Sequence, residues 1–275
     1  MILQTRLSRE EDYKCLQLAI GAMWILVNLG GMGSRSNRGG GNLKVKKEPP
    51  SYGLETKFQI EATDSGGLAA ELAAGIQSVK NLYRNIFSDE SRNLISGSTE
   101  FDVIDSKTAA LYLWQSQNAE DNDYWDSLLD VFGQKYQKFR LRYNNATQDD
   151  YKEIKDWLQS GGKTSVTTIK RAAFGLPLQF RFSSKALKGK QASVEATGGI
   201  NRSSSPLHIR VIELSNQTVA LLVIHFKTQL LPINQKLRLR SKQVNQQLTL
   251  PAPNQDIIDK EFIPTLDNIT TVIVP

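Results

Sequence analysis

The chain has 275 residues, of which 40% are hydrophobic and 23% charged, the ordinary composition of a soluble globular protein with a sizeable core. Its single cysteine, Cys15, excludes a disulfide framework within the chain and is typical of a reducing cytosol, so we expect a cytoplasmic protein. One cysteine and two histidines are too few for a protein-only structural zinc site, and we expect neither a metal nor a cofactor.

The net charge is +6, and the charges are segregated along the chain. Acidic residues are absent from 157–194 and from 214–255, whereas they gather between residues 90 and 156. Such segregation can create a positive face, and a polyanion is the commonest partner for one. A solvated basic surface is the alternative.

The first elements read as a short strand and a helix. Residues 1–7 suit a strand, and Ser8 with Glu11 resembles a capping box that opens a helix. The apolar run at residues 15–29 is shorter than the roughly 20 residues that cross a bilayer, so no membrane partner is expected. Its apolar residues recur at three- and four-residue spacing, which predicts a buried helix that ends at Gly30.

A glycine-rich basic stretch follows, in which residues 29–47 read LGGMGSRSNRGGGNLKVKK. It lacks the Gly-Lys-Ser/Thr of a Walker A loop, and Ser36 stands where a dinucleotide fingerprint needs its third glycine, so both motifs are excluded. Glycines let a backbone approach a phosphate chain, and Arg35 and Arg38 supply forked donors that match phosphate oxygens. The stretch therefore suggests contact with a nucleic-acid backbone, and a flexible surface loop is the alternative.

The rest of the chain predicts a mixed α+β protein. Leu43 and Val45 alternate with lysines as in a weak strand, and residues 48–53 read as a boundary because they combine prolines and a glycine. Helical periodicity predicts three helices, at residues 67–87, 122–143 (turning basic towards its end) and 149–159. The last segments are predicted to be extended at 164–182, a hairpin at 206–231 with its turn at 215–217, and a helix at 257–266.

Candidates for catalysis are few. His208 and His225 are the only histidines that could act as general acid or base in metal-free RNA cleavage. Both lie in the predicted hairpin beside basic residues, and strand pairing could bring them to one face; two ordinary half-exposed strand residues are the alternative. Asp121 and Asp123 form an acidic pair without a nearby third ligand, which is a weak indication of a metal site.

Charged and aromatic patterns add two further expectations. Three cations, Lys236, Arg238 and Arg240, alternate with leucines and share one face of a predicted strand, where they either contact phosphate or guard a sheet edge against aggregation. Trp114, Trp125 and Trp157 fall within helical or apolar patterns, which favours core positions for them over base-stacking platforms.

Three segments, in this order, resemble motifs of one family: GGMGSRSNRGGG at residues 30–41, FGLPL at 174–178 and RSSSPLHI at 202–209. Together they are similar to RAMP proteins, the RNA-binding subunits of CRISPR effector complexes, and in particular to the first RAMP subunit of the type III-B Cmr complex. Two positions depart from the family pattern. Asn37 replaces a second arginine, which weakens phosphate contact, and Gly40 replaces an aromatic ring that could stack or pack.

The resemblance implies a division of the chain and a set of site residues. Residues 1–48 are expected to be the C-terminal part of a ferredoxin-like (RRM-like) RAMP domain that lacks most of its N-terminal part, and residues 49–275 a second mixed helix and antiparallel-sheet domain. The RNA-binding residues that it implies are Gly31, Gly33, Ser34, Arg35, Ser36, Arg38, Gly39 and Gly41.

The function implied is not catalytic. Such a chain would be an RNA-binding structural subunit of a type III-B CRISPR ribonucleoprotein that contacts guide RNA, target RNA and other RAMP subunits of the Cmr complex in antiviral defence, with base reading left to the guide. Two alternatives remain open: a RAMP-type metal-independent endoribonuclease that uses His208 or His225, and an inactive truncated remnant.

Overall fold

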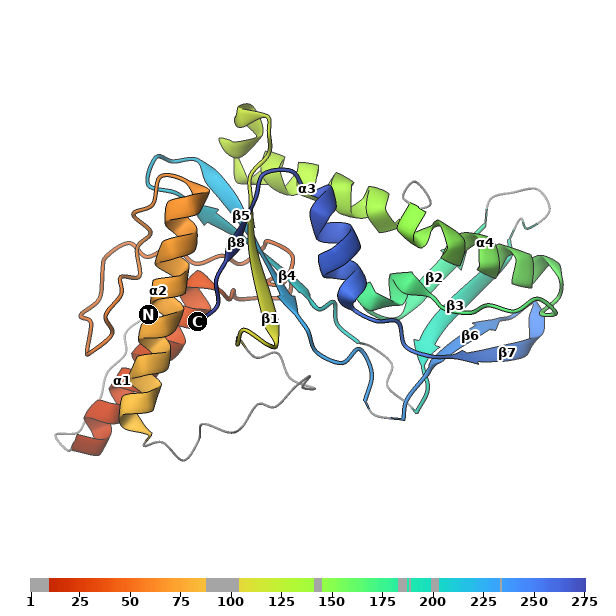
Figure 1. The fold of residues 1–275 in the computed structure, drawn as a ribbon, viewed down its shortest axis with the longest axis horizontal. Coiled ribbons are helices and arrows are strands. Elements are labelled where there is room, and N and C mark those ends of the chain that lie inside the picture. The colour runs from red at the N-terminus through yellow and green to blue at the C-terminus, as the bar shows by residue number, and fades with distance from the viewer. Residues whose placement is uncertain are drawn as a thin grey trace.

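The computed structural model describes residues 10–87, 104–140, 145–182, 187, 189–198, 203–232 and 234–275. The fold is mixed α+β, as predicted, with two antiparallel four-stranded sheets towards opposite ends of an elongated molecule (Figure 1). The first sheet has the order β4-β5-β1-β8, formed by Leu207–Glu213, Val219–Phe226, Ala109–Trp114 and Ile269–Val272. The second has the order β2-β3-β6-β7, formed by Leu178–Arg181, Gln191–Ala196, Leu237–Ser241 and Val244–Leu250.

Helices α1 (Glu10–Asn28) and α2 (Ser65–Ile86) cover one face of the first sheet. The Asp64 side chain caps α2 by accepting a hydrogen bond from the Gly67 N–H at 2.8 Å. The indole of Trp24 on α1 packs directly on Gly75 of α2, where a methyl group would leave no room for the ring. The boundary expected at residue 48 therefore lies within one hydrophobic cluster that draws residues from both sides of it.

The other face of the first sheet packs against helix α3 (Trp125–Arg140) and the short helix η5 (Ile258–Phe262). Side chains of successive strand residues point to opposite faces, so Leu111 and Leu113 enter the cluster under α1 and α2 while Trp114 enters this one. Its centre is a group of rings in mutual contact, namely Phe132, Tyr136, Phe139, Phe174 and Phe262.

The second sheet packs its own cluster against helix α4 (Asn145–Gln159), which contributes the fully buried Trp157. The remaining short helices are η2 (Ala119–Asn122), η3 (Lys170–Phe174) and η6 (Ile263–Thr265). Within the described ranges, no helix combines the length and the apolar character that a membrane span requires.

Most predicted elements are confirmed, with shifted ends. The four helices predicted at 15–29, 67–87, 122–143 and 149–159 correspond to α1 to α4, the hairpin is β4-β5, and short helices occupy much of 257–266. The prediction of a strand at residues 43–45 is wrong, because that segment pairs with none of the described strands. The extended segment at 164–182 is correct only for β2, since residues 170–174 are helical. The strand at 1–7 and the capping residue Ser8 lie outside the described residues.

Candidate nucleic-acid interface

The glycine-rich loop between α1 and α2 is folded against the edge of the first sheet. The Gly39 N–H donates to the Ile209 carbonyl at 2.8 Å, and the Ile209 N–H donates to the Asn37 carbonyl at 3.2 Å. Inside the loop, the N–H groups of Arg38 and Gly40 both donate to the Arg35 carbonyl, at 2.9 and 3.1 Å. The loop is therefore held by backbone pairing along the edge strand β4, unlike an extended linker.

Two glycines of the loop are required by its own packing. Gly41 has φ +68°, and a Cβ there would lie 1.7 Å from the Met32 carbonyl oxygen. Gly39 has φ +78°, and a Cβ would lie 2.5 Å from the Leu129 side chain of α3. These positions therefore bring the loop close to itself and to α3, which is a structural reason for the glycines beside the expected contact with phosphate.

Arg210 on β4 joins the two ends of the loop. Its guanidinium donates to the carbonyl of Gly30 before the loop and to the carbonyl of Leu43 after it, the latter at 3.1 Å. Only 6% of Arg210 is exposed, and burial lowers its pKa to about 10, so the side chain stays charged at neutral pH. In the sequence, Arg210 is only one of the basic residues near the two histidines.

The expected phosphate contacts, Arg35 and Arg38, are exposed. Neither forms an ion pair with any residue that the structure describes. Gly33 and Ser34 are exposed beside Arg35, and the Ser36 hydroxyl lies 3.3 Å from the Asn37 side-chain oxygen. The loop thus presents two uncompensated guanidinium groups to solvent on a backbone that is fixed at both ends.

The three family-like motifs, which are far apart in the sequence, lie next to one another. Leu176 of the second motif pairs with Ser203 of the third through reciprocal backbone hydrogen bonds of 2.9 and 3.3 Å. The third motif leads directly into β4, where Ile209 pairs with the glycine-rich loop. The fold therefore assembles the three motifs along one side of the β4 edge.

A group of basic residues beside these motifs was missed from the sequence. Arg140, at the end of α3, lies over the ring of Tyr136 at 5.2 Å, and Arg171 lies over the ring of Phe180 at 4.8 Å. Burial and then the charge of Arg140 lower the pKa of Arg171, and Asp150 opposes this shift. The Nε atoms of both arginines are buried without a hydrogen-bond partner in the described part of the chain. The basic end of the helix predicted at 122–143 was the signal for Arg140, and the absence of acidic residues from 157–194 was the signal for Arg171.

Tyr136 connects this basic group to the loop. Burial raises the pKa of the Tyr136 hydroxyl, while the charge of Arg140, hydrogen bonds with Ser205 and Arg140, and the charge of Arg38 oppose the rise. Arg38 of the loop, Arg140 of α3 and Arg171 of η3 therefore belong to one positive neighbourhood, which we call the arginine cluster. Like charges gathered in this way favour an anion between them.

A groove of about 690 Å³ lies beside the loop and has Gly39 in its wall. Its lining comes from residues 39–45 of the loop, residues 58–60 and strand β4, with Trp125 of α3 at its border. Trp125 is 60% exposed, so the expectation that it is a core residue is wrong, whereas Trp114 and Trp157 are buried as expected. The first buried position of α3 is Leu128, three residues after Trp125.

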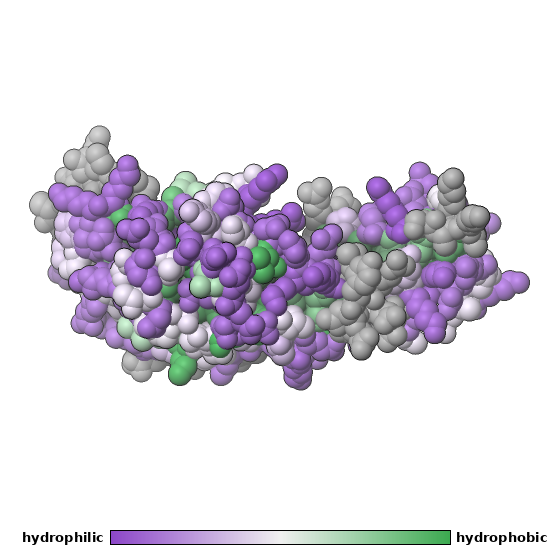
Figure 2. All heavy atoms as spheres, turned by 90° about the horizontal axis from the view of Figure 1, so that it is seen from above, coloured by the Kyte–Doolittle hydropathy of each residue, from purple (hydrophilic) through white to green (hydrophobic). Residues whose placement is uncertain are grey.

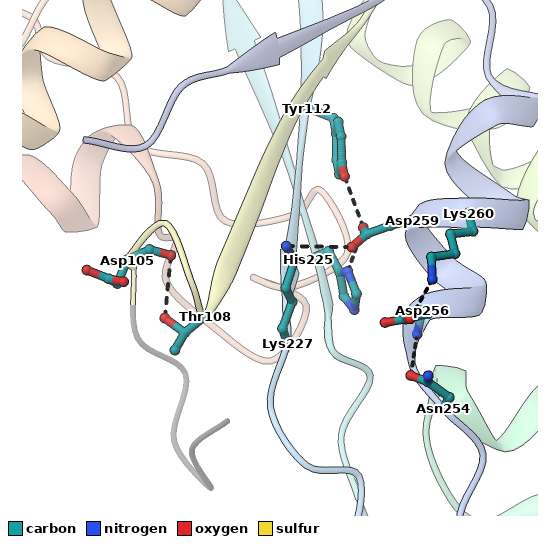
Figure 3. Close-up of polar contacts among 9 residues, drawn as sticks. All are labelled: Asp105, Thr108, Tyr112, His225, Lys227, Asn254, Asp256, Asp259 and Lys260. Carbon is teal, nitrogen blue, oxygen red and sulfur yellow. Dashed lines mark hydrogen bonds and ion pairs between the residues drawn. The ribbon is translucent and has the colours of Figure 1, made fainter. Parts of the chain in front are cut away.

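The two histidines do not share a face. His225 pairs with Leu207 across the hairpin, so its side chain lies on the face opposite to that of His208, which packs edge-to-face on Phe226 at 4.8 Å. His225 is 1% exposed, and its Nδ1 lies 2.7 Å from a carboxylate oxygen of Asp259, which also accepts from the Tyr112 hydroxyl at 3.0 Å (Figure 3). The prediction that the histidines meet on one face is therefore wrong.

The group formed by His225, Asp259 and Tyr112 binds elements of the fold together. Burial would raise the pKa of Asp259, but the hydrogen bond and charge of His225 and the hydrogen bond of Tyr112 lower it overall. Burial, followed by the negative charge of Asp259, raises the pKa of Tyr112. His225 Nε2 is buried without a partner among the described residues, so an RNA strand has no route to it for proton transfer.

The other candidate sites have ordinary structural roles. The Asp121 carboxylate accepts from the Ser116 hydroxyl at 2.7 Å, and the described residues contain no group of three or more acidic, His or Cys side chains that could hold a metal ion. Strand β6 lies between β3 and β7, so the alternative that residues 236–240 guard a sheet edge is wrong. Arg240 and Arg238 both face Glu195 of β3, at 2.7 and 3.6 Å, which satisfies a carboxylate and reduces their availability to phosphate.

Comparison of the chain with family models, with curated proteins and with solved structures finds no match.

Proposed function

We propose that the chain binds single-stranded RNA through its glycine-rich loop and the adjacent arginine cluster, as a non-catalytic subunit of a type III-B CRISPR ribonucleoprotein. In this proposal the N-terminal helix and loop belong to a ferredoxin-like RAMP domain. The chain works in the cytoplasm, contributes to the capture of guide and target RNA, and assembles with other RAMP subunits of the Cmr complex. The protein supplies contacts to the RNA backbone, while base pairing between guide and target supplies sequence recognition.

The observation that carries the proposal is the presentation of Arg35 and Arg38. Both guanidiniums are exposed and lack a carboxylate partner within the described residues, on a loop held by β4 and by Arg210. A guanidinium forms two parallel hydrogen bonds with phosphate oxygens, and a fixed backbone reduces the conformational entropy lost on binding. A flexible loop with incidental arginines would not need the buried charge of Arg210 at its base.

One face of the molecule is mainly hydrophilic, with small and separate hydrophobic areas (Figure 2). This is unlike the large apolar patch of an obligate protein interface. The endoribonuclease alternative gains no support from His225, because both sides of its ring are enclosed. The remaining hypothesis is an endoribonuclease that uses His208. It is tested by measuring RNA cleavage in EDTA with the parent chain and with His208→Ala.

The test is RNA affinity as a function of salt. A labelled single-stranded RNA is titrated with the parent chain and with Arg35→Ala/Arg38→Ala. The double variant is expected to bind more weakly, with a log–log salt slope shallower by about 1 to 1.5, because each lost phosphate contact on single-stranded RNA contributes about 0.7. The control is Arg84→Ala/Arg181→Ala, which removes the same charge from exposed positions on α2 and β2 and should keep the parent slope.

The outcomes separate the possibilities. A slope that is unchanged in the loop variant but reduced in the control would move the contact away from the glycine-rich loop. Equal reductions in both would indicate a nonspecific effect of net charge. Absence of RNA binding by a folded parent chain would contradict the proposed function for this chain.

A further inference from the structure

Trp125 differs from the other tryptophans of the chain in its surroundings. Trp24, Trp114 and Trp157 are each at most 1% exposed and lie inside hydrophobic clusters, whereas Trp125 is 60% exposed. It is the first residue of α3 and lines the groove beside the loop. An exposed indole at the border of a concave surface is a ready platform for a flat ligand.

The position of Trp125 relates it to the expected path of the RNA backbone. Leu129 lies one helical turn after Trp125 and packs against Gly39, the residue that follows Arg38. Tyr136 and Arg140 continue along α3 towards the arginine cluster. Gly39 therefore follows Arg38 in the chain and lines the same groove as Trp125. Alternation of cationic and stacking contacts is the usual form of a single-strand binding site.

The groove itself has the chemistry of a base site. Gly39, Gly40 and Gly41 contribute backbone to its wall, while Leu129, Arg35 and Met32 occupy the positions that their side chains would take. The amide side chains of Asn42 and Gln59 lie in its lining and donate to the Gly39 and Val45 carbonyls at 2.8 and 3.3 Å. Their side-chain oxygens can accept a hydrogen bond from a base edge. Lys44 and Glu213 in the lining pair with each other at 2.8 Å and cancel.

The remaining charge in the groove favours a ligand attached to phosphate. Among the described residues that line it, Arg210 is the one cation without a carboxylate partner. A volume of about 690 Å³ lies within the usual range of small-molecule sites, so one nucleoside fits without rearrangement.

From this geometry we propose that the groove receives an unpaired nucleobase of the bound RNA, stacked on the indole of Trp125. The inference rests on the proposed RNA-binding function and adds the base-stacking subsite to it. Because stacking reads the flat face of a base, the subsite is tolerant of sequence. It suits a strand whose bases are read by a guide elsewhere.

Trp125 is also the reporter for the test, because it is exposed whereas the other three tryptophans are buried. Tryptophan fluorescence is recorded while the parent chain is titrated with oligouridine, and again with a fully abasic ribose-phosphate strand of the same length. Oligouridine is expected to quench the emission, whereas the abasic strand should bind through phosphates without quenching. Trp125→Ala should lose the quenching and bind oligouridine about 5- to 150-fold more weakly, with the parent salt slope retained.

Two variants give the controls. Tyr124→Ala removes a neighbouring aromatic side chain that is 66% exposed but does not line the groove, and should bind like the parent chain. Trp125→Phe keeps a smaller ring and should recover part of the lost affinity. Circular dichroism of each variant checks folding, which truncation of an exposed side chain should leave intact.

The subsite is overturned if Trp125→Ala binds oligouridine like the parent chain, or if base-containing and abasic strands quench equally. In those cases the proposed function would still stand if Arg35→Ala/Arg38→Ala weakens RNA binding and makes the salt slope shallower as expected. A peptide that pairs with the free part of the β4 edge and quenches Trp125 when RNA does not would assign the groove to a protein partner. If the parent chain binds no RNA, the subsite and the proposed function fail together.

Discussion

A single buried residue, Arg210, connects the two ends of the exposed loop. The loop runs out from Gly30 and returns to Leu43, and the Arg210 guanidinium donates to both carbonyls. A neutral side chain of similar length could fill the space but could not satisfy these acceptors. Arg210 therefore stabilises the base of the loop that carries Arg35 and Arg38.

We expect Arg210→Met to lower the free energy of unfolding by about 2–4 kcal/mol, because two carbonyls lose their donor in a buried position. The variant should also bind RNA more weakly, although Arg210 itself is buried. Urea denaturation gives the stability, and the salt titration gives the affinity. Arg210→Lys keeps the charge but not the forked geometry, so its stability and RNA affinity should lie between those of the parent chain and Arg210→Met. A Met variant with the parent's denaturation midpoint would show that the loop is fixed without Arg210.

Among the elements, η3 is attached to α4 by one carboxylate. Asp150 of α4 accepts from the backbone N–H groups of Lys170 and Arg171 at 2.9 and 2.7 Å, which satisfies donors at the start of η3. Burial raises the pKa of Asp150 to about 6, although these hydrogen bonds oppose the rise. The position of Arg171 in the arginine cluster thus depends on a carboxyl group that titrates in a mildly acidic range.

The pH dependence of stability follows from the direction of that shift. A folded-state pKa above the unfolded value means that the folded chain binds more protons between about pH 4 and 6, so the contribution of Asp150 to stability falls as the pH rises through this window. Asp150→Asn removes the titration. The stability of the parent chain relative to Asp150→Asn, from urea denaturation at pH 4 to 7, should therefore decrease with rising pH. A difference that does not change with pH would contradict the prediction.

The elements that the sequence predicted well have one clear periodicity. The apolar residues of α1 and α2 recur at helical spacing, and the hairpin β4-β5 is bounded by a polar turn. Strand β1 was missed because it is largely covered on both faces, which removes the alternation. Strand β8 has only four residues, and much of β7 is exposed. Residues 43–45 do alternate, but a strand also needs a partner, which local sequence does not supply.

The candidate site was only partly predictable for a similar reason. Arg35 and Arg38 stand within one motif and were identified from it. Arg140 and Arg171 belong to different helices and come near each other only when η3 packs beside α3. Trp125 falls within a helical pattern, and its exposure depends on which helix face the loop leaves uncovered. Composition and spacing report such tertiary facts only indirectly.

Across the whole molecule, the short helix η5 ties the first sheet to the rest of the fold. Phe262 contacts Phe132 and Phe139 of α3 at ring distances of 6.0 and 5.2 Å, and Phe174 of η3 at 5.9 Å. Because Phe174 precedes β2, this aromatic group connects the outer face of the first sheet to the chain that enters the second sheet. On the same helix, Asp259 reaches His225 of β5 and Tyr112 of β1.

The hydrogen bonds of Asp259 are expected to change the stability of the chain with pH in the opposite direction to Asp150. The Asp259 carboxylate can only accept, so the ring N–H of His225 and the hydroxyl of Tyr112 both donate to it, and they lower its pKa against the effect of burial. A lowered folded-state pKa gives a stabilisation that is present above the unfolded value, about 3.9, and is lost as the pH falls through the folded value.

Asp259→Asn should therefore lower the free energy of unfolding by about 1–3 kcal/mol at pH 7, because an amide oxygen accepts these donors less strongly than a carboxylate does. The difference from the parent chain should shrink as the pH falls below about 4, whereas the difference for Asp150→Asn should change in the opposite sense between about pH 4 and 6. Urea denaturation of the two variants across pH 3 to 7 measures both trends. If Asp259→Asn is as stable as the parent chain at pH 7, the hydrophobic contacts of Phe262 alone hold η5 to the sheet. The buried His225 would then need another reason for its place in β5.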